Sequence, residues 1–382
     1  MKKIGLVTLY KNNYGSIIQC YSTKTFLEKM GYECIVLSYA KKENNALSKM
    51  LKMARILWKS ARYQGYLEER VSLRHIMKTE STYLSKESFV RMNRFVEDYL
   101  CPVCYSWRDL CDLGKNSEFI AFVVGSDQVW NVGSDIEPFY FLKFVNKRKR
   151  IAFAVSLGVE TMPDFCKSAV KRGVRGFDSI SVREESGKVI INGIEKVKTE
   201  RIADPTILFS DDKWREFYHG SSIPTEPYIF VHFLNRPSEL AINAINWLSK
   251  KMDCSVVCFA YNYDDWRLVK RELFMDGSPN DYVALIDNAK AICTDSFHTI
   301  LFAINFHNKF FAFHRQYLHK HPQTSRITDL LARYRLENRL ITQLEGLYNI
   351  FDKQISDYSL TLDSERRAIT EYLINKISEK EK

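Results

Sequence analysis

The chain has 382 residues, of which 46% are hydrophobic and 13% aromatic. This length exceeds what one hydrophobic core usually supports, so two domains are expected. Lys and Arg outnumber Asp and Glu by 56 to 46, and the net charge of +10 favours anionic partners. The sequence shows no signal-peptide pattern and no apolar run long enough to cross a bilayer, so we expect a cytoplasmic protein.

The nine cysteines are an odd number, and several lie in apolar runs, which favours reduced thiols. Cys101 and Cys104, with Cys111 nearby, have the spacing of half a zinc site. No second Cys/His pair follows at a suitable spacing. We therefore predict no metal site.

Strands and helices alternate over residues 1–218, which predicts an N-terminal α/β domain with a mostly parallel sheet. Its strands are expected at residues 4–9, 34–38, 119–124, 150–155, 179–182 and 201–203.

Residues 41–80 of this domain are predicted to be a basic helical insertion. An apolar stripe recurs there at helical spacing and consists of Leu47, Met50, Leu51, Ala54, Leu57, Trp58 and Ala61. The bases outside this stripe are Lys49, Lys52, Arg55, Lys59 and Arg62. Two interpretations stay open: the helix lies on an anionic membrane surface, or the stripe packs on the protein and the basic face is solvated. The bases are not joined to a recognisable nucleic-acid module, so no nucleic acid is expected.

Residues 220–227 have the composition of a linker, and a second α/β domain is predicted over residues 226–348. Its strands are expected at residues 228–233, 255–260, 291–294 and 310–313, with helices at 238–250, at 281–288 and from about His298. Residues 349–382 are predicted to form a helical tail that packs across the first domain. The predicted fold is thus two facing Rossmann-like α/β domains with a central cleft.

Polar residues crowd the turn after the apolar strand at 119–124. Gly125 permits a sharp turn there, and Ser126, Asp127, Gln128 and Asn131 follow it. Trp130 has two interpretations, because an indole packs against a sugar face and also fills cores.

Three other strand ends supply candidate residues. In the first loop, Asn13, Tyr14 and Gly15 precede a helix whose N-terminus favours anions. Arg183 ends another strand, where it would hold a carboxylate or phosphate, or pair with Glu184. In the second domain, His298 follows a strand and is either a general acid or base or a buried structural histidine.

Six segments in order resemble the polysaccharide pyruvyl transferase family: NNYGSIIQ at 12–19, VGSDQVWN at 124–131, IAFAVSLG at 151–158, ISVRE at 180–184, ADPT at 203–206 and TDSFH at 294–298. The resemblance implies a GT-B-like enzyme that transfers a pyruvyl group from phosphoenolpyruvate to a sugar and forms a ketal. Phosphoenolpyruvate would be a co-substrate, and no cofactor is expected.

The resemblance also implies roles for the candidate residues. His298 would be the general acid and Asp127 the catalytic base. The donor would be held by Arg183, Ser296, Thr299 and Arg315. The acceptor would be held by Asn13, Tyr14, Gly15, Ser126, Gln128, Trp130 and Asn131. This acceptor would be a sugar or lipid-linked oligosaccharide of a surface polysaccharide, such as a capsule or exopolysaccharide, and a lipid-linked acceptor would place the enzyme peripherally at the inner membrane face.

The chain departs from the family pattern at two points. Some members have Arg-Leu-His where this chain has Ser296, Phe297 and His298, so one phosphate-binding arginine is missing. The small residue, often Gly or Ala, that commonly follows the His is Thr299 here. The alternative function is a GT-B glycosyltransferase with a nucleotide-sugar donor. That function needs an acidic residue for the ribose, whereas Asp281 and Asp287 are better explained as a helix cap and a solvated residue. A membrane-associated scaffold is a third alternative.

Overall fold

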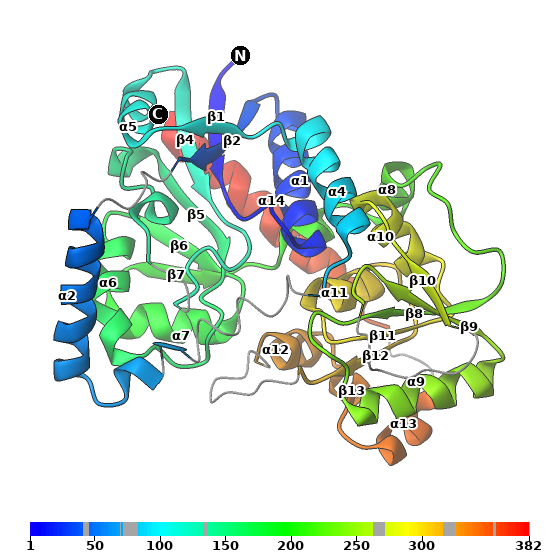
Figure 1. Cartoon of the computed structure of the whole chain (residues 1–382). Helices are drawn as coiled ribbons and strands as arrows, with labels where there is room; N and C mark the ends of the chain where they lie inside the picture. The colour runs from blue at the N-terminus through cyan, green and yellow to red at the C-terminus, as the bar shows by residue number, and fades with distance from the viewer. Residues whose placement is uncertain are drawn as a thin grey trace.

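The computed structural model describes residues 1–40, 46–68, 70–71, 83–132, 136–262, 272–315, 325–353 and 357–381, which form two α/β domains side by side (Figure 1). The first sheet is parallel, with the strand order β3-β2-β1-β4-β5-β6-β7. Its strands are β1 Lys3–Val7, β2 Glu33–Tyr39, β3 Val103–Tyr105, β4 Phe119–Val124, β5 Arg150–Val155, β6 Ser179–Val182 and β7 Lys198–Arg201.

Helices cover both faces of this sheet. They are α1 Tyr14–Lys29, α2 Ala46–Arg62, α4 Lys86–Phe95, α5 Trp107–Lys115, α6 Asp164–Val174 and α7 Glu185–Ile194. The helix α8, Asp211–Phe217, lies beside α10, Pro279–Asp287, of the second domain (Figure 1). Ile17 of α1 packs in one apolar cluster with Ile4 and Leu6 of β1. Leu110 of α5 and Val170 of α6 belong to the cluster on the other face. The sheet is therefore buried on both faces, as parallel sheets require.

The second sheet is also parallel, with the order β10-β9-β8-β11-β12-β13. Its strands are β8 Tyr228–His232, β9 Ser255–Phe259, β10 Glu272–Met275, β11 Ala291–Thr294, β12 Phe310–Phe313 and β13 Leu340–Ile341. Its helices are α9 Glu239–Met252, α10 Pro279–Asp287, α11 Phe297–Asn305, α12 Ser325–Arg333 and α13 Leu344–Phe351. The two parallel α/β domains confirm the predicted fold class.

The C-terminal helix α14, Ser359–Glu381, returns to the first domain and is drawn in red behind its sheet in Figure 1. The Tyr372 hydroxyl donates to the carbonyl oxygen of Ala152 on β5 at 2.7 Å. Near the end of the helix, Glu381 pairs with Lys2 at 3.1 Å. The tail therefore packs across the first domain, as expected from its helical pattern.

The structure contradicts one of the two interpretations of the basic helix α2, namely that its apolar stripe packs on the protein. Met50, Leu57 and Trp58 of the apolar stripe are exposed, so the stripe does not pack on the protein. Residues 41–45, 69 and 72–82 of the predicted insertion lie outside the described residues. No helix in the described part of the chain is long and apolar enough to cross a membrane.

A buried aromatic cluster joins the two domains. Tyr14 of α1 stacks on Tyr282 of α10, with ring centroids 5.1 Å apart, and its hydroxyl donates to the carbonyl oxygen of Gly277 at 2.6 Å. His232 at the end of β8 packs edge-on against both rings. Its Nδ1 lies 2.8 Å from the Thr299 hydroxyl oxygen. Burial, assisted by electrostatic interactions with Arg315 and His298, lowers the pKa of His232 to about 3.

His232 is therefore neutral when folded, and unfolding exposes it to protonation below its ordinary pKa of about 6.5. The stability it contributes is complete above that pH and is lost as the pH falls towards the folded pKa. We predict that the free energy of unfolding of the wild type, minus that of His232→Gln, falls by about 1.4 kcal/mol per pH unit between about pH 6 and about pH 4. Urea unfolding across this range measures the difference, and a constant difference would show that His232 titrates alike in both states.

Candidate active site

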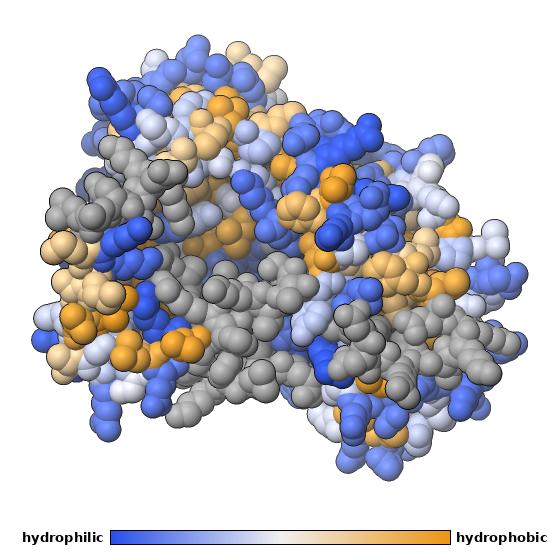
Figure 2. Space-filling view, in the orientation of Figure 1, coloured by the Kyte–Doolittle hydropathy of each residue, from blue (hydrophilic) through white to orange (hydrophobic). Residues whose placement is uncertain are grey.

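A cleft of about 440 Å³ lies where strand ends of the two domains face each other, and Figure 2 shows the hollow between the lobes. Residues 8–13 after β1 and Asp127 after β4 line it from the first domain. From the second domain it is lined by Leu234, Ser296, Phe297, His298, Arg315 and Arg326. Ligands of parallel α/β proteins bind at such strand ends. This cleft is the candidate active site.

Gly125 makes the turn after β4 that presents Asp127. Its φ is +110°, and an added Cβ would lie 2.0 Å from the carbonyl oxygen of Phe153, so both conformation and space require glycine. Ser126 is fully buried behind the cleft. Asp127 borders the cleft, and its Oδ2 accepts a hydrogen bond from the Ser16 hydroxyl at the start of α1.

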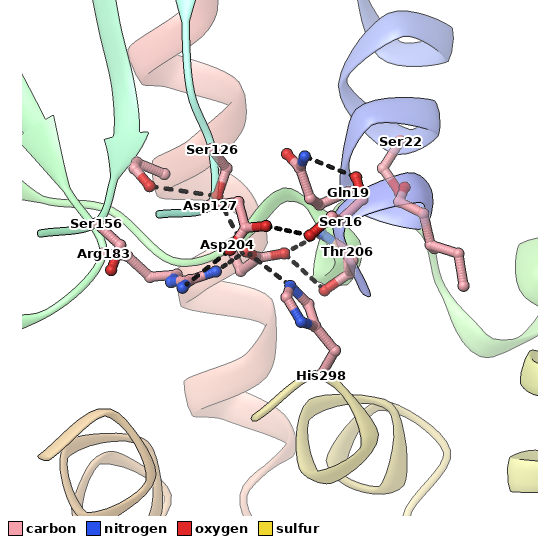
Figure 3. A network of polar contacts seen from close by, with 12 residues as sticks. Ser16, Gln19, Ser22, Ser126, Asp127, Ser156, Arg183, Asp204, Thr206 and His298 are labelled. Atoms are coloured by element: carbon pink, nitrogen blue, oxygen red, sulfur yellow. Dashed lines mark hydrogen bonds and ion pairs between the residues drawn. The ribbon is translucent and has the colours of Figure 1, made fainter. Parts of the chain in front are cut away.

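The carboxylate of Asp204, which follows β7, is the centre of the polar network in Figure 3. Its Oδ2 accepts hydrogen bonds from Ser126 Oγ at 2.9 Å and Arg183 Nη1 at 2.7 Å, and lies 3.6 Å from Nε2 of His298. Its Oδ1 accepts from the backbone and hydroxyl of Thr206 at 3.0 and 2.9 Å. Burial opposes its ionisation, but the contact with His298 and the charge of Arg183 hold the pKa of Asp204 well below its usual range. Asp204 is therefore a buried anion.

Arg183 was predicted to bind the donor, but it lies behind the cleft. Its guanidinium is buried and pairs with Asp204, with Glu184 at 3.3 Å and with Asp127 at 3.6 Å. Phe297 of the second domain covers it, with the guanidinium carbon 4.4 Å from the ring centroid. Arg183 does not line the cleft, and three carboxylates already surround its charge. The structural ion pair, which the sequence left open as an alternative, is what the structure shows.

His298 lies in the first turn of α11 and borders the cleft. Its ring packs against the backbone of Gly15 so closely that a Cβ atom on that glycine would lie 2.0 Å from Nδ1. On its other side Nε2 approaches Asp204. Nε2 makes no protein hydrogen bond, although it is buried. The imidazole is thus held between the two domains, and Gly15 acts on it by leaving space.

Basic and polar groups surround the part of the cleft near α11. Ser296 caps this helix, accepting from the backbone N–H of Thr299 at 3.5 Å. Arg315 lines the cleft and donates from Nε to the carbonyl oxygen of Asp295 at 3.2 Å. Arg326 and Lys11 also line the cleft. Thr299 does not, because it is fully buried and its hydroxyl contacts His232 and Tyr282, each at 2.8 Å.

The first-domain wall of the cleft is rich in aromatic side chains. It is lined by Tyr10, Tyr39, Phe139 and Tyr140, together with Glu137, Asn13 and Gln128. Asn13 also caps α1 by accepting from the backbone N–H of Ser16 at 3.2 Å. Burial is the main cause that raises the pKa of Tyr140 to about 12, so its hydroxyl stays protonated at neutral pH. Aromatic faces with nearby polar groups are suited to binding a sugar.

Five predicted acceptor residues do not line the cleft, namely Tyr14, Gly15, Ser126, Trp130 and Asn131. Ser126 is buried behind the cleft, and Gly15 packs against the imidazole of His298. Trp130 is buried, stacks on Phe141 and donates from Nε1 to the carbonyl oxygen of Tyr140 at 2.7 Å, so it belongs to the core. Tyr14 belongs to the aromatic cluster between the domains. Asn131 is also buried, and its side-chain amide donates to Gln128 Oε1 at 2.7 Å. It therefore orients a residue of the cleft.

The sequence assigned no role to Ser16 and Asp204, and it offered Glu184 only as an ion-pair partner of Arg183. Each of them follows a strand end or begins a helix, as the predicted residues do. This position in the sequence could have identified them as site residues. Ser156 Oγ donates to Glu184 Oε1 at 2.6 Å, which adds β5 to the network. Within the described ranges, no group of three His, Cys, Asp or Glu side chains is arranged to hold a metal ion.

Solved structures with two α/β domains are similar to the whole chain. The UDP-N-acetylglucosamine 2-epimerase from Rickettsia bellii is 10% identical over 99% of this chain and 98% of its own, with a TM-score of 0.51. UGT89C1 from Arabidopsis thaliana, complexed with UDP-L-rhamnose, is 11% identical over 99% of each chain, with a TM-score of 0.52. A putative UDP-N-acetylglucosamine 2-epimerase from Listeria monocytogenes is 9% identical over 96% and 91% of the chains, with a TM-score of 0.53. These similarities show the GT-B fold alone.

No curated protein matches the sequence. The family described as polysaccharide pyruvyl transferase matches residues 13–317, which include the first loop, the Asp204 network and His298. The match covers most of the chain, which therefore belongs to the polysaccharide pyruvyl transferase family.

Proposed function

We propose that this protein transfers the pyruvyl group of phosphoenolpyruvate to a sugar of a surface-polysaccharide precursor and forms a ketal. The observation that carries the proposal is the position of His298. It borders a cleft between the domains, held by Gly15 and Asp204, with basic side chains lining the same cleft. Family membership supports the transferase class.

The donor is proposed to bind near α11. Phosphoenolpyruvate has a carboxylate and a phosphate. Arg315 and Arg326 of the second domain line the cleft, and Lys11 lines it from the first domain. The N-terminus of α11 adds backbone N–H groups that favour an anion. These groups compensate for the arginine that other family members have where this chain has Ser296. Arg183 acts indirectly, by neutralising the carboxylates behind the site.

His298 is the proposed general acid. Proton transfer from its imidazole to the methylene carbon of phosphoenolpyruvate creates an oxocarbenium-like centre at the neighbouring carbon. One sugar hydroxyl attacks this carbon, a second hydroxyl displaces inorganic phosphate, and the two new C–O bonds complete the ketal. One of the two hydroxyl protons reprotonates the imidazole of His298. A base takes the other proton and passes it to the departing phosphate. Asp127 borders the cleft and is the candidate base.

The acceptor is proposed to bind at the first-domain wall, where the rings of Tyr10, Tyr39 and Tyr140 offer faces to a sugar and Gln128 and Glu137 offer hydrogen bonds. This places the acceptor on the first domain and the donor on the second. A lipid-linked sugar is the proposed form of the acceptor. The reason is that the exposed basic helix α2 suits a membrane surface, where a lipid-linked sugar would be held.

A nucleotide-sugar glycosyltransferase is the alternative, and it requires an acidic residue to hold a ribose. Asp281 is engaged in the capping box of α10 with Ser278. Asp287 pairs with Arg215 at 2.9 Å and accepts from the Tyr218 hydroxyl at 2.6 Å. Both acidic residues have structural partners, which favours the pyruvyl donor.

Ligand-dependent stability tests the donor directly. We predict that phosphoenolpyruvate at 100-fold excess over its Kd raises the Tm by about 5 °C, because binding then stabilises the fold by about 2.7 kcal/mol and each kcal/mol shifts a chain of this size by roughly 2 °C. UDP-sugars and inorganic sulfate serve as controls in the same thermal-shift assay. A rise with a UDP-sugar and none with phosphoenolpyruvate would replace the proposal by the glycosyltransferase alternative.

Gly15→Ala tests the position of His298. Alanine favours a helix, but its Cβ would displace the imidazole, so we predict a loss of transfer approaching the ~100- to 10,000-fold loss expected for His298→Ala, with the fold intact. Gly193→Ala is the matched control, because this helical glycine has open space around it. Release of phosphate and circular dichroism provide the readouts. Full activity in Gly15→Ala would show that the imidazole needs no fixed position.

A further inference from the structure

The helix α2 packs on the first domain with its less apolar side. Ile56 packs against the core as a partly buried residue. Lys59 donates from Nζ to the carbonyl oxygen of Phe165 on α6 at 3.0 Å, and its ammonium lies 5.5 Å from the centroid of that ring. Burial is the main cause that lowers the pKa of Lys59. One base of the helix is therefore used as an anchor to α6, beside which α2 runs in Figure 1.

The apolar side of α2 faces outward. Met50, Leu51, Leu57 and Trp58 are 69%, 61%, 64% and 57% exposed. At 100° per residue these side chains lie on one side of the helix, opposite Ile56. Figure 2 shows apolar residues gathered at this edge of the molecule. A helix that turns its apolar side away from the protein has the reverse of the usual arrangement, and such a surface marks an interaction site.

The charge of α2 is of one sign. Its sequence, ALSKMLKMARILWKSAR, has five basic residues and no acidic one. Arg55 and Arg62 lie along one border of the apolar side, and Lys49 is exposed near the start of the helix. Arg62 also covers the Trp58 ring, with its guanidinium carbon 5.5 Å from the centroid. The surface therefore combines an apolar strip, an indole and flanking positive charges.

We infer that α2 docks the protein on an anionic lipid bilayer. Its 17 residues form a rod of about 25 Å that can lie in the plane of the interface. The apolar strip would enter the boundary between headgroups and acyl chains, Trp58 would lie at headgroup level, and the bases would meet anionic lipid. The same face on a second copy is a poorer partner, because two such helices in symmetric contact would oppose their positive charges. The inference goes beyond the proposed function and does not depend on the identity of the donor.

The experiment is co-sedimentation of the full chain with vesicles at low salt, using phosphatidylglycerol/phosphatidylcholine vesicles and pure phosphatidylcholine vesicles. The charge variant is Lys49→Gln with Arg55→Gln and Arg62→Gln, which leaves the Lys59 anchor in place. The apolar variant is Leu57→Gln with Trp58→Gln. The matched control is Val189→Gln with Leu360→Gln, which changes side chains of 66% and 83% exposure on other helices. Thermal unfolding of each variant reports whether the fold is kept.

The wild type and the matched control should sediment with the anionic vesicles and much less with the neutral ones. Each base removed should weaken partition by about fivefold, so the charge variant should bind on the order of 100-fold more weakly, and the weakening should shrink in high salt. The apolar variant should lose binding to both vesicle types. Absence of wild-type sedimentation with anionic vesicles would overturn the inference. So would a dimer, seen by analytical ultracentrifugation, that the apolar variant dissociates, because the strip would then be an interface between copies.

Discussion

The buried charge of Asp204 is the constraint on which the site depends. A carboxylate without water is costly, and this one is stabilised by hydrogen bonds from Ser126, Thr206 and Arg183. Those residues follow different strands of the first sheet, so the strand ends must meet for the charge to be tolerated. The second domain completes the arrangement, because Phe297 covers Arg183 and His298 approaches Asp204. Two successive residues of α11 thus connect domain packing to the cleft.

This arrangement also bears on where the anionic donor of the proposed function would bind. Arg183 is surrounded by Asp127, Glu184 and Asp204, so these carboxylates neutralise its positive charge within the protein. Of the basic side chains that line the cleft, Lys11 comes from the first domain, and Arg315 and Arg326 come from the second. Arg315 also pairs with Asp295 at 3.8 Å. In the proposed function, the basic side chains that line the cleft would hold the anionic donor, and the buried cluster behind them keeps His298 in position.

Much of the fold was predictable because the strands are short apolar runs between turn residues. β4 and β5 were predicted at the bounds that the structure shows. β3 was missed because its three residues are not buried, and β13 because it has only two residues. The site was predictable as a set of strand ends, but the partners within it were not. Whether Arg183 faces a ligand or a carboxylate depends on Asp204, which lies on another strand end. For Trp130, the local sequence does not distinguish a sugar-binding indole from a core residue. The outward direction of the α2 stripe depends on the contact between Lys59 and Phe165.

The most direct test is the free energy of unfolding of Asp204→Asn, measured beside Asp211→Asn, which removes an exposed ion pair with Arg215. Loss of a buried partner should cost about 3–5 kcal/mol at neutral pH, whereas the exposed pair should cost less than about 1 kcal/mol. Because the pKa of Asp204 is lowered on folding, its contribution is complete above the unfolded pKa of about 3.9 and should diminish as the pH falls below it. A cost for Asp204→Asn as small as that for Asp211→Asn, and unchanged in acid, would contradict the account.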